Sequence, residues 1–328
     1  MTLQTLFRMI SGCAIALALQ AGSPVLSVAH AAPYSIETLP DATVYNDFVV
    51  GPGKYQVDAK PGETKTVNMI VTNRLGKEKA FQIQLEDFVG SRDLQKTVVL
   101  LDNERGPYSL KDYLRIASST FVLNNAERVT IPVTIQIPTD AQPGGLYGSV
   151  VISTVTSPAE QRPAGSAGIS PIVTRIGSLF FIRVAGEVKQ DLILKEFSLK
   201  GDSRIVGSSP VDFQLLYENN GSIHENPSGS IRVRNMFGSE VATLEVEPWF
   251  VMPDSLRLRE VSWNSPFLFG RYVATAEIHK GYDNLTDTAS VAFWVIPWKI
   301  ILAVFIVIVI IVAGIRFIAS KINISLKK

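Results

Sequence analysis

The 328-residue sequence predicts an all-β protein: two tandem immunoglobulin-like β-sandwich domains followed by a single C-terminal transmembrane helix. Three observations lead to this prediction. Apolar and polar residues alternate at period two over most of the chain, clusters of Gly, Pro and Asn separate the alternating stretches, and one apolar run near the C-terminus is long enough to cross a bilayer. The length fits about two domains once the terminal segments are set aside.

The N-terminus has the layout of a secretory signal peptide, which we expect to occupy residues 1–31. Arg8 supplies a basic start, a long apolar run follows, and small residues end the segment at Ala31. We expect cleavage after Ala31, because Pro33 would obstruct a cut one residue later. A lipoprotein signal ending at Cys13 is the alternative. We reject it because the apolar run continues beyond Cys13.

The strands are predicted from alternation. Phe81, Ile83 and Leu85 are interleaved with polar residues, which is the pattern of a half-buried strand. Many short strands in series, separated by turn residues, favour antiparallel sandwiches. Strands are predicted around residues 67–71, 81–85, 129–137, 211–217, 231–233, 272–278 and 291–295.

Two local features interrupt this pattern. A single short helix is predicted over residues 110–116, where Ser109 can cap the first turn and Asp112 lies within it. Pro132 falls inside an otherwise good strand. Because proline has no N–H to donate to a neighbouring strand, we expect that strand to lie at a sheet edge.

The domain limits depend on residues 157–168, SPAEQRPAGSAG, which have the composition of a linker. We favour a long hairpin loop there, because residues 172–188 contain further strand material that the first domain can use. The boundary then falls near residues 186–189. The first domain would comprise residues 33–188 and the second residues 189–296.

Residues 297–319 predict the transmembrane helix, because they span about 30 Å of hydrocarbon if Lys299 and Arg316 extend to the two interfaces. Trp294 and Trp298 lie where an interfacial aromatic belt is expected. The tail, residues 320–328, contains basic residues and no acid, which places it in the cytoplasm. We therefore expect a single-pass protein of a bacterial cell membrane with an extracellular ectodomain.

Charge and cysteine usage exclude several classes of function. Six of the 31 basic residues lie either in the predicted signal peptide or in the predicted transmembrane helix and its tail, whereas all 30 acids lie between these segments. The ectodomain is therefore net acidic and offers no basic field for nucleic acid. Cys13 is the only cysteine, and cleavage of the signal peptide removes it. The mature chain then has no disulfide, thiolate nucleophile or cysteine metal site.

No set of residues predicts catalysis, a cofactor or a metal site. His224 and His279 each stand alone, without a second histidine at metal-ligand spacing. Glu86 and Asp87 are adjacent strand residues, so their side chains point to opposite faces and cannot bracket one bond. We expect no enzymatic activity. Tyr147 and Asn220, both in glycine-containing stretches, are the candidates for loops that contact a partner.

Several short stretches, taken in order along the chain, carry a resemblance to a known family. They are residues 58–63 (DAKPGE), 67–73 (VNMIVTN), 137–147 (IPTDAQPGGLY), 175–179 (RIGSL), 218–221 (ENNG), 227–231 (PSGSI) and 236–241 (MFGSEV). Their order resembles the WxL-interacting family of bacterial cell-surface proteins, which has a first immunoglobulin-like domain of the peptidoglycan-binding type, a second immunoglobulin-like domain and a C-terminal membrane anchor. The resemblance implies peptidoglycan, or a WxL-type surface protein, as the partner of this chain.

The sequence thus predicts a membrane-anchored binding or scaffold protein that engages cell-wall polymer or another surface protein. The alternative is an accessory subunit for assembling or exporting a surface polymer, in the manner of a strand-donating chaperone. The sequence specifies neither the ligand nor the oligomeric state.

Overall fold

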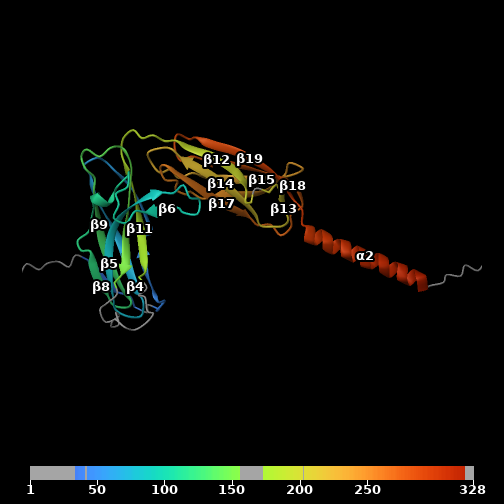
Figure 1. Cartoon of the computed structure of the whole chain (residues 1–328), viewed down its shortest axis with the longest axis horizontal. Helices are drawn as coiled ribbons and strands as arrows, with labels where there is room; N and C mark the ends of the chain where they lie inside the picture. The colour runs from blue at the N-terminus through green and yellow to red at the C-terminus, as the bar shows by residue number, and fades with distance from the viewer. Residues whose placement is uncertain (1–33, 41–42, 156–172, 202, 322–328) are drawn as a thin grey trace, which may run out of the picture.

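The computed structural model describes residues 34–40, 43–155, 173–201 and 203–321. Its strands form four sheets arranged as two sandwiches, and one long helix, α2 (Trp298–Lys321), leaves the second sandwich (Figure 1). The prediction of a mainly β chain with a C-terminal apolar helix is confirmed. The predicted signal peptide and its cleavage site at Ala31 lie outside the described residues.

The first sandwich consists of a five-stranded and a six-stranded sheet. In the five-stranded sheet the order is β1-β9-β4-β2, and β7 also pairs with β9; in the six-stranded sheet the order is β3-β11-β10-β5-β6, and β8 also pairs with β5. The bounds are β1 (Ser35–Thr38), β2 (Asp47–Gly51), β3 (Lys54–Ala59), β4 (Thr64–Arg74), β5 (Lys79–Gly90), β6 (Val98–Leu100), β7 (Leu114–Arg115), β8 (Thr120–Leu123), β9 (Glu127–Gln136), β10 (Gly144–Thr154) and β11 (Arg175–Val184).

The core of the first sandwich consists of the alternating apolar residues that predicted its strands. Met69 of β4, Phe81 of β5 and Ile131 of β9 are completely buried between the sheets. Phe81 stacks on Phe121 of β8 and meets Phe48 of β2 edge to face. Side chains from both sheets therefore interdigitate in one core, as the period-two pattern requires.

The chain changes sheets near Pro52. β2 pairs antiparallel with β4 in one sheet, and β3, which follows it, pairs parallel with β11 in the other. That parallel pairing begins at Leu179 of β11 and runs to Val184. The residues of β11 that precede Leu179 therefore have no residue of β3 opposite them, because β3 begins only at Lys54.

The second sandwich consists of a three-stranded sheet, β12-β14-β17, and a five-stranded sheet, β13-β19-β18-β15-β16. Phe213, Tyr217 and Phe293 are among its largest buried side chains. The bounds are β12 (Leu192–Leu199), β13 (Ile205–Val206), β14 (Val211–Asn219), β15 (Ser228–Asn235), β16 (Glu240–Val246), β17 (Ser255–Trp263), β18 (Gly270–His279) and β19 (Thr286–Val295).

The connection between the two sandwiches runs from the end of β11 at Val184 to the start of β12 at Leu192. The predicted limits of the two domains, at residues 188 and 189, stay a prediction. β10 and β11 pair antiparallel, Ser153 opposite Arg175, as expected for the two arms of a hairpin. Most of the connecting segment that prompted this prediction, residues 157–168, lies outside the described residues.

Two local predictions were wrong. Residues 110–116 do not form a helix: a single 3-10 turn, η1 (Lys111–Tyr113), leads directly into β7, and Ser109 makes no capping bond. β9 is not an edge strand, because it lies between β4 on one side and β1 and β7 on the other. Pro132 is tolerated there because it falls between the end of the β1 pairing at Thr130 and the start of the β7 pairing at Thr134.

α2 is apolar from Ile300 to Ile315, with Lys299 and Arg316 on either side of that run. Within Trp298–Ala319 its most apolar stretch has a mean hydropathy of 3.1, and none of that stretch is buried against the rest of the chain. By length and composition this helix can cross a membrane.

Candidate functional site

The two sandwiches meet through a cluster of aromatic side chains on the outer face of the six-stranded sheet. Phe88, Tyr147 and Phe181 come from the first sandwich, and Met252 and Phe250 come from the second. The ring of Phe181 lies 5.3 Å from that of Phe88 and 4.9 Å from that of Phe250, both nearly edge to face. Such contacts pack the sandwiches against one another as a domain core is packed.

Tyr147 is the centre of this interface. Its hydroxyl accepts the backbone N–H of His224 at 2.7 Å and lies 3.2 Å from Nδ1 of the same residue. Its own backbone N–H is donated to the carbonyl of Tyr108 at 2.7 Å. The prediction that Tyr147 belongs to a partner-contact loop was wrong. It lies within β10 and is fully buried, because the second sandwich covers it.

His224 connects the two sandwiches in its neutral form. The side-chain amide of Gln56 lies 3.3 Å from Nε2, so each ring nitrogen of His224 has a polar partner, Tyr147 at Nδ1 and Gln56 at Nε2. Burial, together with the nearby charges of Lys54 and Arg183, lowers the pKa of His224 to about 4. At neutral pH the ring is therefore uncharged. It links the second sandwich, to which it belongs, to Gln56 of β3 and Tyr147 of β10 in the first sandwich.

This arrangement predicts acid sensitivity at the interface. The unfolded chain protonates His224 near pH 6.5 and the folded chain only near pH 4, so the unfolded state binds more protons between these values. The stability contributed by neutral His224 is complete above pH 6.5 and is lost as the pH falls toward 4. Relative to a His224→Gln variant, the unfolding free energy of the wild type should decrease by about 3 kcal/mol over this range. Urea titrations of both proteins measure the difference, and a difference that does not change with pH would contradict the assignment.

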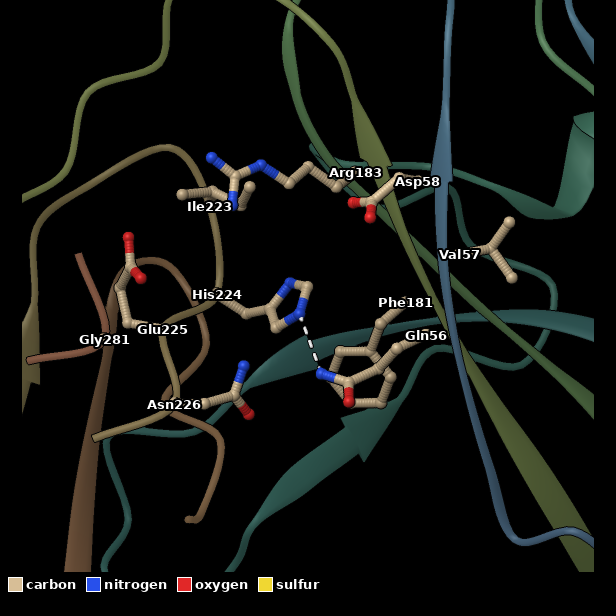
Figure 2. A pocket seen from close by; sticks show the side chains of 10 residues that line it. All are labelled: Gln56, Val57, Asp58, Phe181, Arg183, Ile223, His224, Glu225, Asn226 and Gly281. Carbon is tan, nitrogen blue, oxygen red and sulfur yellow. Dashed lines mark hydrogen bonds between the residues drawn. The ribbon is translucent and has the colours of Figure 1, made fainter. Parts of the chain in front are cut away.

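A cavity of about 310 Å³ opens beside His224, between the two sandwiches (Figure 2). Gln56, Phe181 and Arg183 line it from the first sandwich, and His224 and Glu225 line it from the second. Burial raises the pKa of Glu225, whereas a hydrogen bond from Gln190 at 2.9 Å favours its ionised form. The cavity is polar and open enough for a side chain or a chain end of a partner, and the adjoining aromatic cluster forms its apolar wall.

Two cations lie in or near this cavity and form no close ion pair among the described residues. Arg183 is exposed on β11, and Lys54 begins β3. The Lys54 ammonium lies 5.7 Å from the ring of Phe181 and 5.5 Å from that of Phe250. Such contacts hold a cation in place without neutralising it. The border of the cavity is therefore suited to a carboxylate or a carbonyl oxygen.

Further contacts fix the angle between the sandwiches. Tyr108 donates a hydrogen bond to Asp254 at 3.0 Å, and the backbone N–H of Leu256 is donated to the carbonyl of Ser91 at 3.0 Å. Gly90 approaches the second sandwich so closely that a Cβ atom there would lie 2.5 Å from Cβ of Met252. The interface thus combines apolar packing with hydrogen bonds across it.

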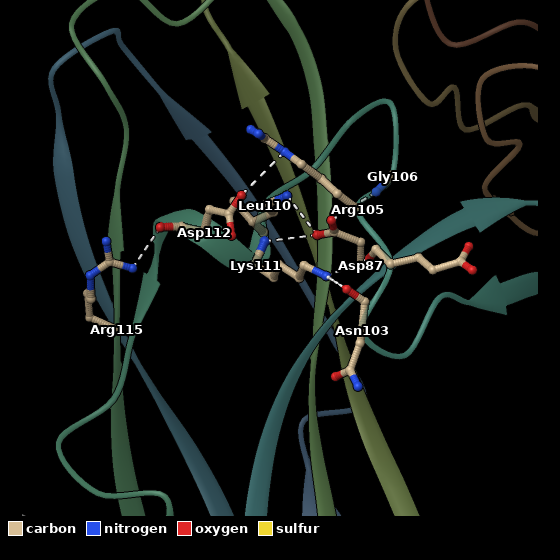
Figure 3. A network of polar contacts seen from close by, with 9 residues as sticks. Asp87, Asn103, Arg105, Gly106, Leu110, Lys111, Asp112 and Arg115 are labelled. Carbon is tan, nitrogen blue, oxygen red and sulfur yellow. Dashed lines mark hydrogen bonds and ion pairs between the residues drawn. The ribbon is translucent and has the colours of Figure 1, made fainter.

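Asp87 holds the loop between Gly106 and Lys111 (Figure 3). Tyr108 belongs to this loop. Its buried carboxylate accepts the backbone N–H groups of Leu110 at 3.0 Å, Lys111 at 2.9 Å and Gly106 at 3.1 Å. Asp87 rather than Ser109 therefore satisfies the first N–H groups of η1. This loop reaches the second sandwich through Tyr108, so Asp87 supports the interface from within the first sandwich.

Glu86 points to the opposite face of β5. It pairs there with Arg175 at the start of β11, and Arg175 also pairs with Asp102 at 3.4 Å. Burial raises the pKa of Glu86. The two adjacent acids thus have separate structural roles, consistent with the strand geometry from which the sequence analysis argued.

The start of β11 has an uncovered edge. Thr154 donates its N–H to Thr174 on the β10 side, and Leu179 donates its N–H to Gly53 on the β3 side. Because backbone groups alternate in direction along a strand, Arg175 and Gly177 direct their N–H and C=O groups to the β3 side. β3 does not extend that far, and within the described residues no other strand pairs with this edge.

The other residues singled out from the sequence occupy separate places. Asn220 is half-buried in the turn after β14, where its N–H is donated to Asp191 and its carbonyl accepts Lys189. Trp294 is the penultimate residue of β19 and has 45% of its surface exposed; Trp298 and Lys299 begin α2, and Arg316 lies near its end. Their roles at a partner or at a membrane interface stay predictions.

Sequence reasoning missed the interface and the uncovered edge. Tyr147 and His224 are far apart in sequence, and no periodicity links them. The available signal was local: the aromatic residues Phe88, Tyr147 and Phe181 lie on the sheet face that the alternation assigns to solvent, and aromatic residues on such a face indicate a second packing surface.

No family model and no curated protein matches this chain. Solved structures that resemble it include the class 5 fimbrial chaperone CfaA, with 11% identity over 76% of this chain and 100% of that one and a TM-score of 0.35. The Pseudomonas aeruginosa chaperone CupB2 has 13% identity over 75% of this chain and 100% of that one, with a TM-score of 0.34. The E. coli chaperone DraB has 13% identity over 76% and 95%, with a TM-score of 0.32. At these values the similarities carry no argument about function.

Proposed function

We propose that this chain binds an extended segment of a partner protein as an added β-strand on the uncovered edge of β11. This is the accessory role in assembling a surface polymer that the sequence analysis gave as its alternative. The observation that carries the proposal is the pair of outward-facing backbone groups at Arg175 and Gly177, which have no strand partner among the described residues. A peptide backbone supplies the complementary donors and acceptors at the right spacing, whereas a glycan does not.

Apolar side chains beside this edge can receive those of a partner. Val50 of β2 and Ile176 of β11 are only partly buried and pack against the core of the first sandwich. Val173, just before β11, is 52% exposed. A strand added here would place alternate side chains between the two sheets, where its apolar residues extend the existing core.

One cation at the interface between the sandwiches lies next to this edge. Lys54 lies where the pairing of β3 with β11 begins, so it borders the end of the uncovered edge. Its ammonium is held against Phe181 and Phe250 and can bind a carbonyl or carboxylate of the partner chain. Arg183 offers a second such group within the cavity.

We further propose that α2 anchors the chain in a bacterial membrane, with the sandwiches outside and the basic tail in the cytoplasm. The length and hydropathy of the helix support this proposal. The peptidoglycan ligand and the WxL-type partner implied by the resemblance stay predictions.

The proposal is tested at Gly177. A Gly177→Pro substitution removes the outward N–H and leaves the pairing with β10 unchanged, since Ile176 and Ser178 make the bonds to that strand. Gly177→Ala is the matched control, because it keeps the N–H and its Cβ meets only Val151 at an ordinary 3.5 Å. A photocrosslinking residue at Val173 in the full chain identifies the partner in native membranes.

We expect the wild type and Gly177→Ala to crosslink to an alternating apolar segment of one protein, and Gly177→Pro to lose at least about tenfold of that yield. Equal yields from the alanine and proline variants would exclude strand addition at this edge. Sedimentation of the same three proteins with purified peptidoglycan tests whether the chain instead binds cell-wall polymer. If all three proteins sediment equally with peptidoglycan, the wall polymer is favoured as the ligand.

A further inference from the structure

One end of the second sandwich carries large apolar side chains that point into solvent. Phe237 is 84% exposed at the tip of a tight turn, where polar residues are usual. Phe267 and Phe269 lie on either side of the buried Leu268, so both point outward. We call this surface the apolar collar; its residues are Ile205, Met236, Phe237, Phe267, Phe269 and Trp294.

The sheet register brings these residues to one end of the sandwich. Asn235, at the end of β15, pairs with Tyr272, close to the start of β18. Gly270 of β18 pairs with Val295, the last residue of β19, and Ile205 of β13 lies beside Trp294. A Cβ atom at Gly270 would lie 3.6 Å from Sδ of Met236, which confirms that the separate turns meet.

This is the end from which α2 leaves (Figure 1). Only Ile296 and Pro297 separate β19 from α2. The connection is held to the sandwich, because Ile296 donates its N–H to Val206 at 2.9 Å and a Cβ atom at Gly207 would lie 3.4 Å from the ring of Trp298. Because the connection is so short, this end of the second sandwich must lie close to any surface that α2 enters.

Exposed cations surround the apolar collar. Arg204 precedes Ile205, Arg234 lies in β15 near Met236, and Arg271 follows Gly270. Within the described part of the chain none of the three forms an ion pair with an acid. Aromatic side chains with nearby unpaired arginines fit the boundary between acyl chains and anionic headgroups.

We propose that the apolar collar lies in the headgroup layer of the membrane that α2 crosses, so that the second sandwich is seated on the bilayer at several points. This rests on the proposed anchoring by α2. The first sandwich and its uncovered edge are then held at a fixed height and tilt, because apolar packing and hydrogen bonds around Tyr147 and His224 join the two sandwiches. A partner protein or a second copy of the chain covering the collar is the alternative that the test separates.

The test uses the full mature chain, which has no cysteine of its own once the predicted signal peptide is removed. Phe237→Cys and Phe267→Cys variants carry an environment-sensitive fluorophore and are reconstituted in nanodiscs of phosphatidylcholine and phosphatidylglycerol. Leu285→Cys is the matched control, because Leu285 is an exposed apolar residue in the turn at the opposite end of the sandwich. Val307→Cys reports on insertion of α2.

Lipids with a nitroxide near the headgroup should quench the labels at positions 237 and 267 at least about threefold more than the label at 285. Lipids with a deep nitroxide should quench the label at 307. If 307 is quenched but 237 and 267 behave like 285, the helix is inserted and the seating is excluded. If 307 is not quenched, the anchoring itself fails. A fluorophore at 237 that is shielded from water but not quenched by lipid would show that protein covers the collar.

Discussion

Replacing Asp87 with alanine is expected to lower the unfolding free energy by about 3–5 kcal/mol, because three buried backbone N–H groups lose their acceptor at once. The loop from Leu101 to Lys111 should then exchange its amide hydrogens faster, those of Leu110 and Lys111 most of all. Urea denaturation measures the first effect and hydrogen exchange the second.

Asp112→Ala is the control for this experiment. Asp112 lies in the same turn, but among the described residues its carboxylate pairs only with Arg105 at the surface, at 3.3 Å. Its removal should leave the stability within about 1 kcal/mol of the wild type. An Asp87→Ala protein as stable as Asp112→Ala would show that the buried carboxylate does not hold the loop.

The second large effect is expected from Gly90→Val. A side chain at Gly90 meets the Cβ atoms of Met252 and Ser255 at 2.5 Å, and neither can withdraw without moving the backbone of the second sandwich. We expect a loss of about 3 kcal/mol and a change in the angle between the sandwiches. Urea denaturation measures the loss, and small-angle scattering measures the change in shape.

The matched control is Gly53→Val, because a Cβ atom at Gly53 has no heavy atom within 4 Å. It introduces the same β-branched side chain into a strand border without a clash. Equal behaviour of the two variants in scattering and denaturation would mean that the close approach at Gly90 does not set the angle.

The strands could be predicted because a strand with one buried face alternates apolar and polar residues along the sequence. Phe81, Ile83, Val129 and Ile131 alternate with polar residues, and each is buried in the core of the first sandwich. The apolar length of α2 was equally plain. These features depend on the contrast between neighbouring residues, which a single sequence displays.

What could not be predicted depends on residues distant in sequence. The helix expected at 110–116 was wrong because Leu114 and Arg115 pair with Ile135 and Thr134 of β9, so the chain becomes extended directly after η1. Pro132 was assigned to an edge strand because the sequence around it does not show that β1 and β7 leave a gap opposite this residue. Tyr147 was assigned to a surface loop because nothing in its own neighbourhood shows that His224 covers it.

The change of sheet at Pro52 has a consequence for how this protein acquires its structure. β3 has only one strand partner among the described residues, and in that pairing Lys54 meets Leu179. During synthesis, β3 must therefore wait for most of the first sandwich to be made before its hydrogen bonds can form. Contacts so distant in sequence slow folding and leave strand edges unprotected meanwhile. We expect the β3–β11 pairing to be among the last steps in folding of the first sandwich, so that the edge proposed to receive a partner is adjacent to the edge that closes last.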